Sequence, residues 1–306
     1  MSSYMKNINV LIKLYKGYGL GDAVQMSAVL RHVTKYRRNW VVDFQAERGR
    51  QCVGNGIVTG KTFVYGEPYP SDHYDAEVEI ILYDTWANLG DRPNTRVSSC
   101  LHERFGLDWD RECGSYFIEV SDKALEAVDI LTACNPKLVA VHYQGDSSPD
   151  KKNLTHIQAA AICKEIEKLG YTPLLLDWRN ISPLPDRNSI CTTGGIPKSK
   201  EWGGDAEMNC AVISQCKAFI GIDSGPSKCA SATDTPALVI WTGHHPAPFH
   251  DPAPNTTHLV PQGYHGLEPV CGNQCVVKWF ERNYSVRQYD HDPVSEVTSW
   301  LKGVLK

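Results

Sequence analysis

The sequence contains no apolar run long enough to cross a lipid bilayer. Of its 306 residues, 42% are hydrophobic and 22% are charged, as in ordinary globular proteins, whereas a membrane-spanning helix needs about 20 consecutive apolar residues. The apolar stretch near the N-terminus, MSSYMKNINVLIKLY, is interrupted by Lys13 and is not followed by a small-residue cleavage site. We therefore expect no transmembrane segment and no signal peptide, and we interpret this stretch as a first strand.

An excess of charge of either sign is also missing. The net charge is −4, which gives no indication of a surface for nucleic acid or for anionic membranes. The 11 cysteines are scattered and odd in number, and without a secretory signal their simplest state is reduced thiols. The composition predicts a cytoplasmic protein, and the length of 306 residues predicts two domains of ordinary size.

The sequence also lacks a complete set of metal ligands. Cys271 and Cys275 have a spacing close to that of metal ligands, but a four-ligand site needs two more residues and the sequence has no matching second pair. We therefore predict that the protein requires no metal or other cofactor. Cys271 and Cys275 remain the candidate ligands if a metal is bound.

What the sequence does contain is a regular alternation of strand and helix patterns. In the first part, a strand, a glycine-rich turn, a helix and a second strand are expected at Ile8–Tyr15, 17–21, Asp22–Tyr36 and Trp40–Ala46. After Pro136, strands and helices alternate again at Leu138–Tyr143, Leu154–Leu169, Thr172–Asp177, Asp205–Cys216, Ala218–Asp223, Pro226–Ala232 and Ala237–Trp241. This order predicts an α/β protein with two doubly wound parallel sheets.

The change of pattern near Pro136 sets the expected domain boundaries. Residues 1–134 are expected to form an N-terminal Rossmann-like domain, and residues 135–290 a second, C-terminal one. Residues 291–306 end in a helical pattern, for which packing against the N-terminal domain is one possible arrangement. Ligands of such folds bind beyond the carboxyl ends of the strands, so the turns after Tyr15, Tyr143 and Ile222 are the places to search for a site.

The first of these turns, YKGYGLGDAV, ends in an acid. Glycines at 17, 19 and 21 allow a tight backbone and the close approach of a ligand. Asp22 opens the expected helix, so it is either an N-terminal cap or a carboxylate that takes a proton from a hydroxyl. This turn alone favours the cap.

The second turn, HYQGDSSPDKKNLTHIQ, places two cations before a helix. Lys151 and Lys152 stand where positive charge opposes the helix dipole. They are either a solvated pair of side chains or the partners of a bound anion.

The third turn, GIDSGPSK, joins a strand to a helix rich in small residues. Pro226 suits the first helical position, and Ser224 with Gly225 suits the cap. Free backbone N–H groups at Ser227 and Lys228 would form an anion site. Asp223, at the end of the strand, would face the space between the domains.

Together these three turns resemble those of glycosyltransferase family 9, the heptosyltransferase-like family with the GT-B fold. GLGDAVQMSAVL is similar to the N-terminal Gly-Asp motif of the family, and VAVHYQGDSSPDKKN is similar to the strand and lysine loop that open its second domain. AEMNCAVISQCKAFIGIDSGPSKCASATDTPALVIW resembles its nucleotide-sugar motif. The resemblance extends from the first strand to about Pro246, and it implies two Rossmann-like domains that face a central cleft.

The resemblance also implies a role for each matching position. Asp22 would be the general base, Asp223 would lie near the transferred sugar, and Glu207 would contact the nucleotide ribose. Donor phosphates would be bound by Lys151, Ser224, Gly225, Pro226, Ser227 and Lys228. Further residues expected to line the cleft are Gly21, Thr242, Gly243 and His244.

Two positions depart from the family pattern. The usual histidine of the nucleotide-sugar motif is Lys228 here, and the aromatic residue after the lysine loop is Asn153. These departures leave the identity of the donor open, since a rearranged site would fit a sugar or nucleotide other than those of ADP-heptose.

The expected function is therefore that of an inverting, metal-independent glycosyltransferase. Its donor would be a nucleoside-diphosphate sugar, and its acceptor a hydroxyl of a glycan, a lipid-linked sugar, a protein or a modified nucleic-acid base. Two alternatives stay open on the sequence: a nucleotide-sugar epimerase of the same fold, and a non-catalytic protein that binds sugar nucleotides.

Overall fold

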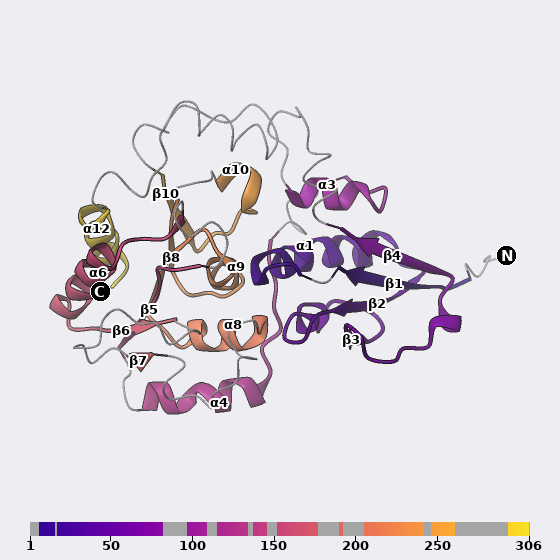
Figure 1. The fold of residues 1–306 in the computed structure, drawn as a ribbon, viewed down its shortest axis with the longest axis horizontal. Helices are drawn as coiled ribbons and strands as arrows, with labels where there is room; N and C mark the ends of the chain where they lie inside the picture. Colours follow the sequence, from indigo (N-terminus) through magenta and orange to yellow (C-terminus); the bar gives the residue numbers. More distant parts are fainter. Residues whose placement is uncertain are drawn as a thin grey trace.

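The computed structural model describes most of both expected sheets. Its described residues are 6–15, 17–81, 97–108, 115–133, 137–145, 152–176, 190–191, 205–241, 246–260 and 293–305. Figure 1 shows two α/β units joined at the centre of the molecule, with the helices arranged around each sheet.

The first sheet has four parallel strands in the order β3-β2-β1-β4. The strands are β1 (Ile8–Leu14), β2 (Trp40–Ala46), β3 (Thr62–Val64) and β4 (Ala76–Ile80). The helices and short turns of this part are α1 (Leu20–Tyr36), η1 (Gln51–Gly54), η2 (Ser71–His73) and α3 (Val97–Glu103). The prediction for Trp40–Ala46 is confirmed at both ends, and α1 begins two residues before the expected Asp22.

The second sheet has six parallel strands in the order β10-β9-β8-β5-β6-β7. The strands are β5 (Leu138–His142), β6 (Thr172–Leu175), β7 (Ile190–Cys191), β8 (Ala218–Ile222), β9 (Ala237–Ile240) and β10 (Thr256–Leu259). The helices are α4 (Asp122–Ala133), α6 (His156–Lys168), α8 (Ala206–Ser214), α9 (Gly225–Ser231), α10 (Pro246–Phe249) and α12 (Val294–Val304). Two parallel sheets with crossover helices confirm the predicted α/β class.

The central strands of the second sheet are apolar on both faces. Every residue of β5 (LVAVH) and β8 (AFIGI) is buried, because helices cover both sides of the sheet. On one side, α6 and α12 cover a core that contains Val139 and Ile220. The core on the other side runs on into the first domain, so one continuous apolar cluster connects the two sheets.

Two helices pack against a different part of the protein than their position in the sequence suggested. The C-terminal helix α12 packs on α6, and its buried residues Val297 and Leu301 belong to the core of the second domain, not to the N-terminal domain. Likewise α4, which precedes residue 134, contacts α8. The boundaries at 134 and 290 remain predictions, because residues 134–136 and 261–292 lie outside the described ranges.

None of the helices that the structure describes combines the length and the apolar character that a membrane span requires.

Candidate functional site

The two domains meet where the first turns of α1 and α9 touch. A Cβ atom added at Gly225 would lie 2.7 Å from the Cβ of Leu20 and 2.9 Å from the backbone nitrogen of Gly21. A Cβ atom added at Gly21 would lie 3.3 Å from the Cα of Gly225. The distances at Gly225 are too short for any side chain, whereas the contact at Gly21 is tight. Glycine at 225 is therefore what allows the starts of α1 and α9 to approach, and these two helices lie side by side in Figure 1.

Asp22 lies in the first turn of α1, beside this contact. Its Oδ2 accepts a hydrogen bond from the backbone N–H of Gly19 at 3.1 Å. Gly19, and not Asp22, is the N-cap residue; Asp22 is the third residue of the helix, so its carboxylate closes the helix start as the acid of a capping box does. Burial raises the pKa of Asp22 above its ordinary value. The positive charges of Lys228 and Lys152 and the Gly19 amide oppose this shift, whereas the negative charge of Asp223 adds to it.

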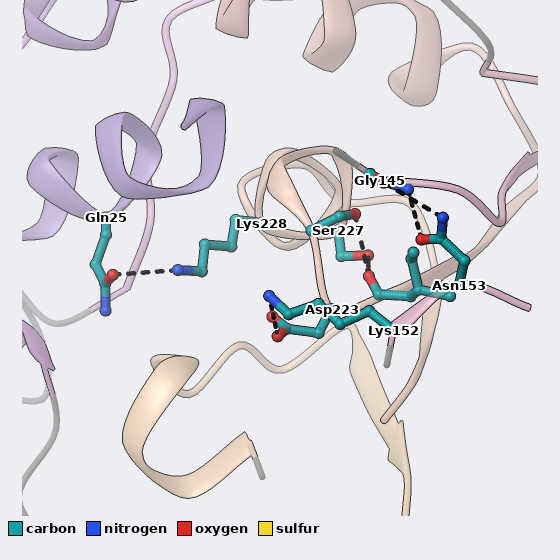
Figure 2. A network of polar contacts seen from close by, with 9 residues as sticks. Gln25, Gly145, Lys152, Asn153, Asp223, Ser227 and Lys228 are labelled. Atoms are coloured by element: carbon teal, nitrogen blue, oxygen red, sulfur yellow. Dashed lines mark hydrogen bonds and ion pairs between the residues drawn. The ribbon is translucent and has the colours of Figure 1, made fainter. Parts of the chain in front are cut away.

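Lys228, in α9, extends toward the first domain. Its Nζ donates a hydrogen bond to the Oε1 of Gln25 in α1 at 3.1 Å, and only 6% of its surface is exposed (Figure 2). Burial lowers the pKa of Lys228, and the charges of Asp22, Asp223 and Asp251 favour its protonated form. Lys228 is therefore placed among carboxylates.

Asp223 follows β8 and forms an ion pair with Lys152. The Nζ of Lys152 lies 3.1 Å from the Oδ2 of Asp223, and both side chains are largely buried. The next residue, Asn153, accepts a hydrogen bond from the N–H of Gly145 at 2.8 Å and donates one to its carbonyl at 3.3 Å. Asn153 thereby ties the end of the lysine loop to the turn after β5 (Figure 2).

The serines at the start of α9 are bonded to the strand before it. The hydroxyl of Ser224 donates to the carbonyl of Ile222 at 3.1 Å, and the hydroxyl of Ser227 donates to the same carbonyl. Ser224 stands at the cap position, but its side chain accepts no hydrogen bond from the helix. The Lys228 amide donates to the Ser224 carbonyl at 3.4 Å, so it is not free as the sequence suggested.

Glu207 is occupied by a contact within the protein. It lies in the first turn of α8, and its Oε1 accepts hydrogen bonds from the backbone N–H of Ser121 at 3.0 Å and from the Ser121 hydroxyl at 2.5 Å. This contact joins α8 to the residue before α4. The expected contact between Glu207 and a ribose stays a prediction.

Several expected site residues lie outside the described ranges: Lys151, Thr242, Gly243, His244, Cys271 and Cys275. Across the residues that are described, no three His, Cys, Asp or Glu side chains lie close enough together to hold a metal ion.

Two residues at the domain contact, Gln25 and Asp251, were missed by sequence reasoning. Lys152 was named with Lys151 as a possible partner of an anion, but only Lys151 received a role in donor binding. Gln25 stands inside a recognised motif, and nothing in the spacing indicated that its side chain faces the site. Asp251 lies in the segment after α10, where its Oδ1 accepts a hydrogen bond from the Ser98 hydroxyl at 2.5 Å. Its N–H donates to the Tyr116 hydroxyl at 2.8 Å. Only the fold brings Ser98 and Tyr116 to Asp251.

Comparison with known proteins gives similar structures but no similar sequence. Neither a family model nor a curated protein matched the chain. A glycosyltransferase family 9 structure from Veillonella parvula superposes with a TM-score of 0.69 at 12% identity, over 98% of this chain and 97% of that one. The dodecameric iron-containing heptosyltransferase TibC, in complex with ADP-D-beta-D-heptose, superposes with a TM-score of 0.61 at 16% identity, over 98% of this chain and 76% of that one.

A third similar structure is the Escherichia coli heptosyltransferase WaaC with ADP-2-deoxy-2-fluoro heptose. Its TM-score is 0.57 at 14% identity, and the superposition covers 90% of this chain and all of that one. Identities this low establish a shared fold, and the shared fold extends over nearly the whole chain. The chain therefore has the GT-B architecture of glycosyltransferase family 9 and heptosyltransferase structures, with two Rossmann-like domains.

Proposed function

We propose that the protein is a glycosyltransferase that moves a sugar from a nucleoside-diphosphate sugar to an acceptor hydroxyl. The observation that carries this proposal is the position of Asp22. Its carboxylate lies at the junction of the two domains, within the field of two lysine ammonium groups and beside Asp223. A base next to cations is what transfer from a diphosphate donor requires, since one group takes a proton while others stabilise the leaving charge.

Asp22 is the proposed general base. As the acceptor hydroxyl attacks the anomeric carbon, its proton passes to the Asp22 carboxylate while the bond from that carbon to the diphosphate oxygen breaks. A desolvated carboxylate with a raised pKa is a better proton acceptor than one in water. The Gly19 N–H fixes one of its oxygens, so the cap and the base are two functions of the same side chain. Attack in a single step inverts the anomeric centre.

The leaving diphosphate is proposed to lie at the start of α9, on the side of Lys152 and Asp223. Contact between Gly21 and Gly225 leaves no room for a phosphate between the two helices, so the group has to lie next to this contact. Lys152 is held there by Asp223, and Lys151 precedes it in the chain. Lysine side chains stabilise a developing phosphate charge without a metal. We propose that Ser224, Gly225, Pro226 and Ser227 line the same position.

The class of donor is proposed from the similar structures. TibC and WaaC were solved with ADP-heptose or an analogue of it, and both have the fold of this chain. We propose a nucleoside-diphosphate sugar as donor and make no choice of sugar. Asp223 would contact the transferred sugar, and Glu207 would reach the ribose after releasing Ser121.

A transfer assay tests this proposal. The protein is screened by thermal shift against ADP, UDP and GDP sugars, since a bound ligand raises the melting temperature in proportion to its affinity. The best donor, labelled in its sugar, is then incubated with glycan, lipid-linked, protein and nucleic-acid acceptors. The proposal predicts labelled acceptor and free nucleoside diphosphate. Formation of an epimerised donor without any acceptor, or binding without turnover, would contradict it.

A further inference from the structure

The side chain of Lys228 extends across the domain junction and binds the side-chain amide of Gln25. Its Nζ donates to the Oε1 of Gln25 at 3.1 Å, and the two side chains are 6% and 1% exposed. Figure 2 shows the Lys228 side chain extended toward Gln25 and directed away from the Lys152–Asp223 pair. A lysine placed to bind donor phosphates would instead direct its ammonium to the side of Lys152.

The hydrogen bond fixes the orientation of the Gln25 amide. An ammonium group can only donate, so the Gln25 atom that faces Lys228 has to be the carbonyl oxygen. The Nε2 of Gln25 then points away from Lys228, and within the described part of the chain this buried atom has no hydrogen-bond partner. Among the described residues, Lys228 is thus the one hydrogen-bond partner that orients the Gln25 side chain.

The charges around Lys228 lead to the same conclusion. Its ammonium interacts with the carboxylates of Asp22, Asp223 and Asp251, and with the positive charge of Lys152. Three carboxylates against two ammonium groups leave a surplus of negative charge. Lys152 is already paired with Asp223, so Lys228 is the cation that remains for Asp22 in the described part of the chain. Among the charges that lower the pKa of Asp22, that of Lys228 has the largest effect.

We propose that Lys228 is a positioning residue for Asp22: anchored by Gln25, it holds a positive charge beside the base and does not bind the donor phosphates. This inference rests on the proposed function, since it assigns a group that keeps the base ionised. It also gives a reason for lysine at this position, because a positive charge here offsets the cost of burying the carboxylate of the base.

The test compares Lys228→Met with the unaltered protein. Methionine keeps an unbranched stem of similar length and removes the charge. Without the cation the acid limb of the pH profile for kcat moves to higher pH, and kcat at pH 7 falls by about tenfold. The dissociation constant for ADP, measured by calorimetry, stays within about twofold. Lys228→Arg, which keeps the charge, restores the acid limb.

Two further variants test whether Lys228 acts on the charge of Asp22 or only holds the two domains together. Tyr116→Phe removes another hydrogen bond to the segment after α10, the one from the Asp251 backbone N–H; it leaves the carboxylates in place and is expected to leave the acid limb unmoved. Gln25→Leu removes the anchor of Lys228 and lowers kcat by about threefold, with the ADP dissociation constant unchanged. Gln25→Leu also serves as the test if Lys228→Met does not fold, and an unaltered kcat in it overturns the anchoring.

A measurement without any donor distinguishes this inference from the proposed function. The carboxyl of Asp22 is titrated by carbon-13 NMR, with its signal assigned by comparison with Asp22→Asn. The inference predicts that this carboxyl titrates at higher pH in Lys228→Met, whether or not the protein transfers sugar. An unmoved titration, or an ADP dissociation constant that rises tenfold with an unmoved acid limb, overturns it. Absence of transfer with every donor, together with a moved titration, would count against the function and leave the placement of Lys228 intact.

Discussion

The ammonium group of Lys228 is hydrogen-bonded to the side-chain carbonyl of Gln25, which lies 203 positions away in the chain. This contact joins α9 of the second domain to α1 of the first (Figure 2). Gln25 lies about one helical turn after Asp22 in α1. The two helices carry the motifs that the sequence singled out, and the fold turns them into one site.

The approach of α1 to α9 depends on glycine at 225. We predict that Gly225→Ala lowers the stability of the folded protein by about 1–3 kcal/mol, because the added methyl group overlaps Leu20 and Gly21. Gly303→Ala is the matched control: this helical glycine has no atom within 4 Å of an added Cβ. The control is expected to raise stability by about 0.5–1 kcal/mol. Thermal unfolding measures the change in stability of both variants. Equal melting temperatures would show that α1 and α9 are not in contact.

The Lys152–Asp223 pair is predicted to serve the donor diphosphate. Lys152→Ala should weaken ADP binding by roughly tenfold, since it removes a charge-assisted contact to phosphate. Lys168→Ala, which removes an exposed lysine paired with Glu165, should leave binding unchanged. Calorimetric titration with ADP compares the two variants, together with Lys151→Ala for the neighbouring lysine. Undiminished affinity in both Lys151→Ala and Lys152→Ala would exclude this loop from donor binding.

Burial of Asp22 predicts a cost in stability that depends on pH. Because its pKa is raised in the folded protein, the folded state binds this proton more tightly than the unfolded chain does. The free energy of unfolding therefore falls as the pH rises through the pKa of Asp22, and the cost is absent below the ordinary aspartate range. We predict that Asp22→Asn melts at an equal or higher temperature than the unaltered protein at pH 7, and that the difference vanishes near pH 3. A melting temperature clearly lower at pH 7 would show that the charge stabilises the fold.

Lysine side chains are proposed to replace a metal in the stabilisation of the leaving diphosphate. We predict that dialysis against a chelator leaves the transfer rate within about twofold of its initial value. Metal analysis of the same sample, with Cys271→Ser and Cys275→Ser as comparisons, reports on the one cysteine pair with near-metal spacing. Loss of transfer on chelation, with recovery on return of a metal, would overturn metal independence.

The sequence was sufficient for the fold because its strands and helices carry strong local signals. Buried runs such as LVAVH and AFIGI identify central strands of a parallel sheet. Gly21 marks the turn after β1, and Gly225 marks the turn after β8. The short strands β3 and β10 were missed, since three or four residues at the edge of a sheet show too little periodicity. The side on which α12 packs depends on contacts with α6 and was likewise not encoded locally.

The site could be predicted only as separate turns. Asp22, Asp223 and Lys228 each follow from a motif, but their common location depends on how the two domains meet. The sequence indicated Lys152 only together with Lys151, as a possible partner of an anion, and it gave no signal for Gln25. The direction of a side chain at a domain contact is set by tertiary packing. The sequence gave no signal for Asp251 either, since its partners Ser98 and Tyr116 lie more than a hundred positions away.

The turnover of Asp22→Asn tests the central claim most directly. The rate of sugar transfer and the dissociation constant of the donor are measured for this variant and for the unaltered protein, with Asp122→Asn as the control at an exposed helix start. The account predicts a fall in kcat of about a hundredfold or more in Asp22→Asn alone, with donor affinity nearly unchanged. An unaltered kcat in Asp22→Asn would contradict the assignment of Asp22 as the base.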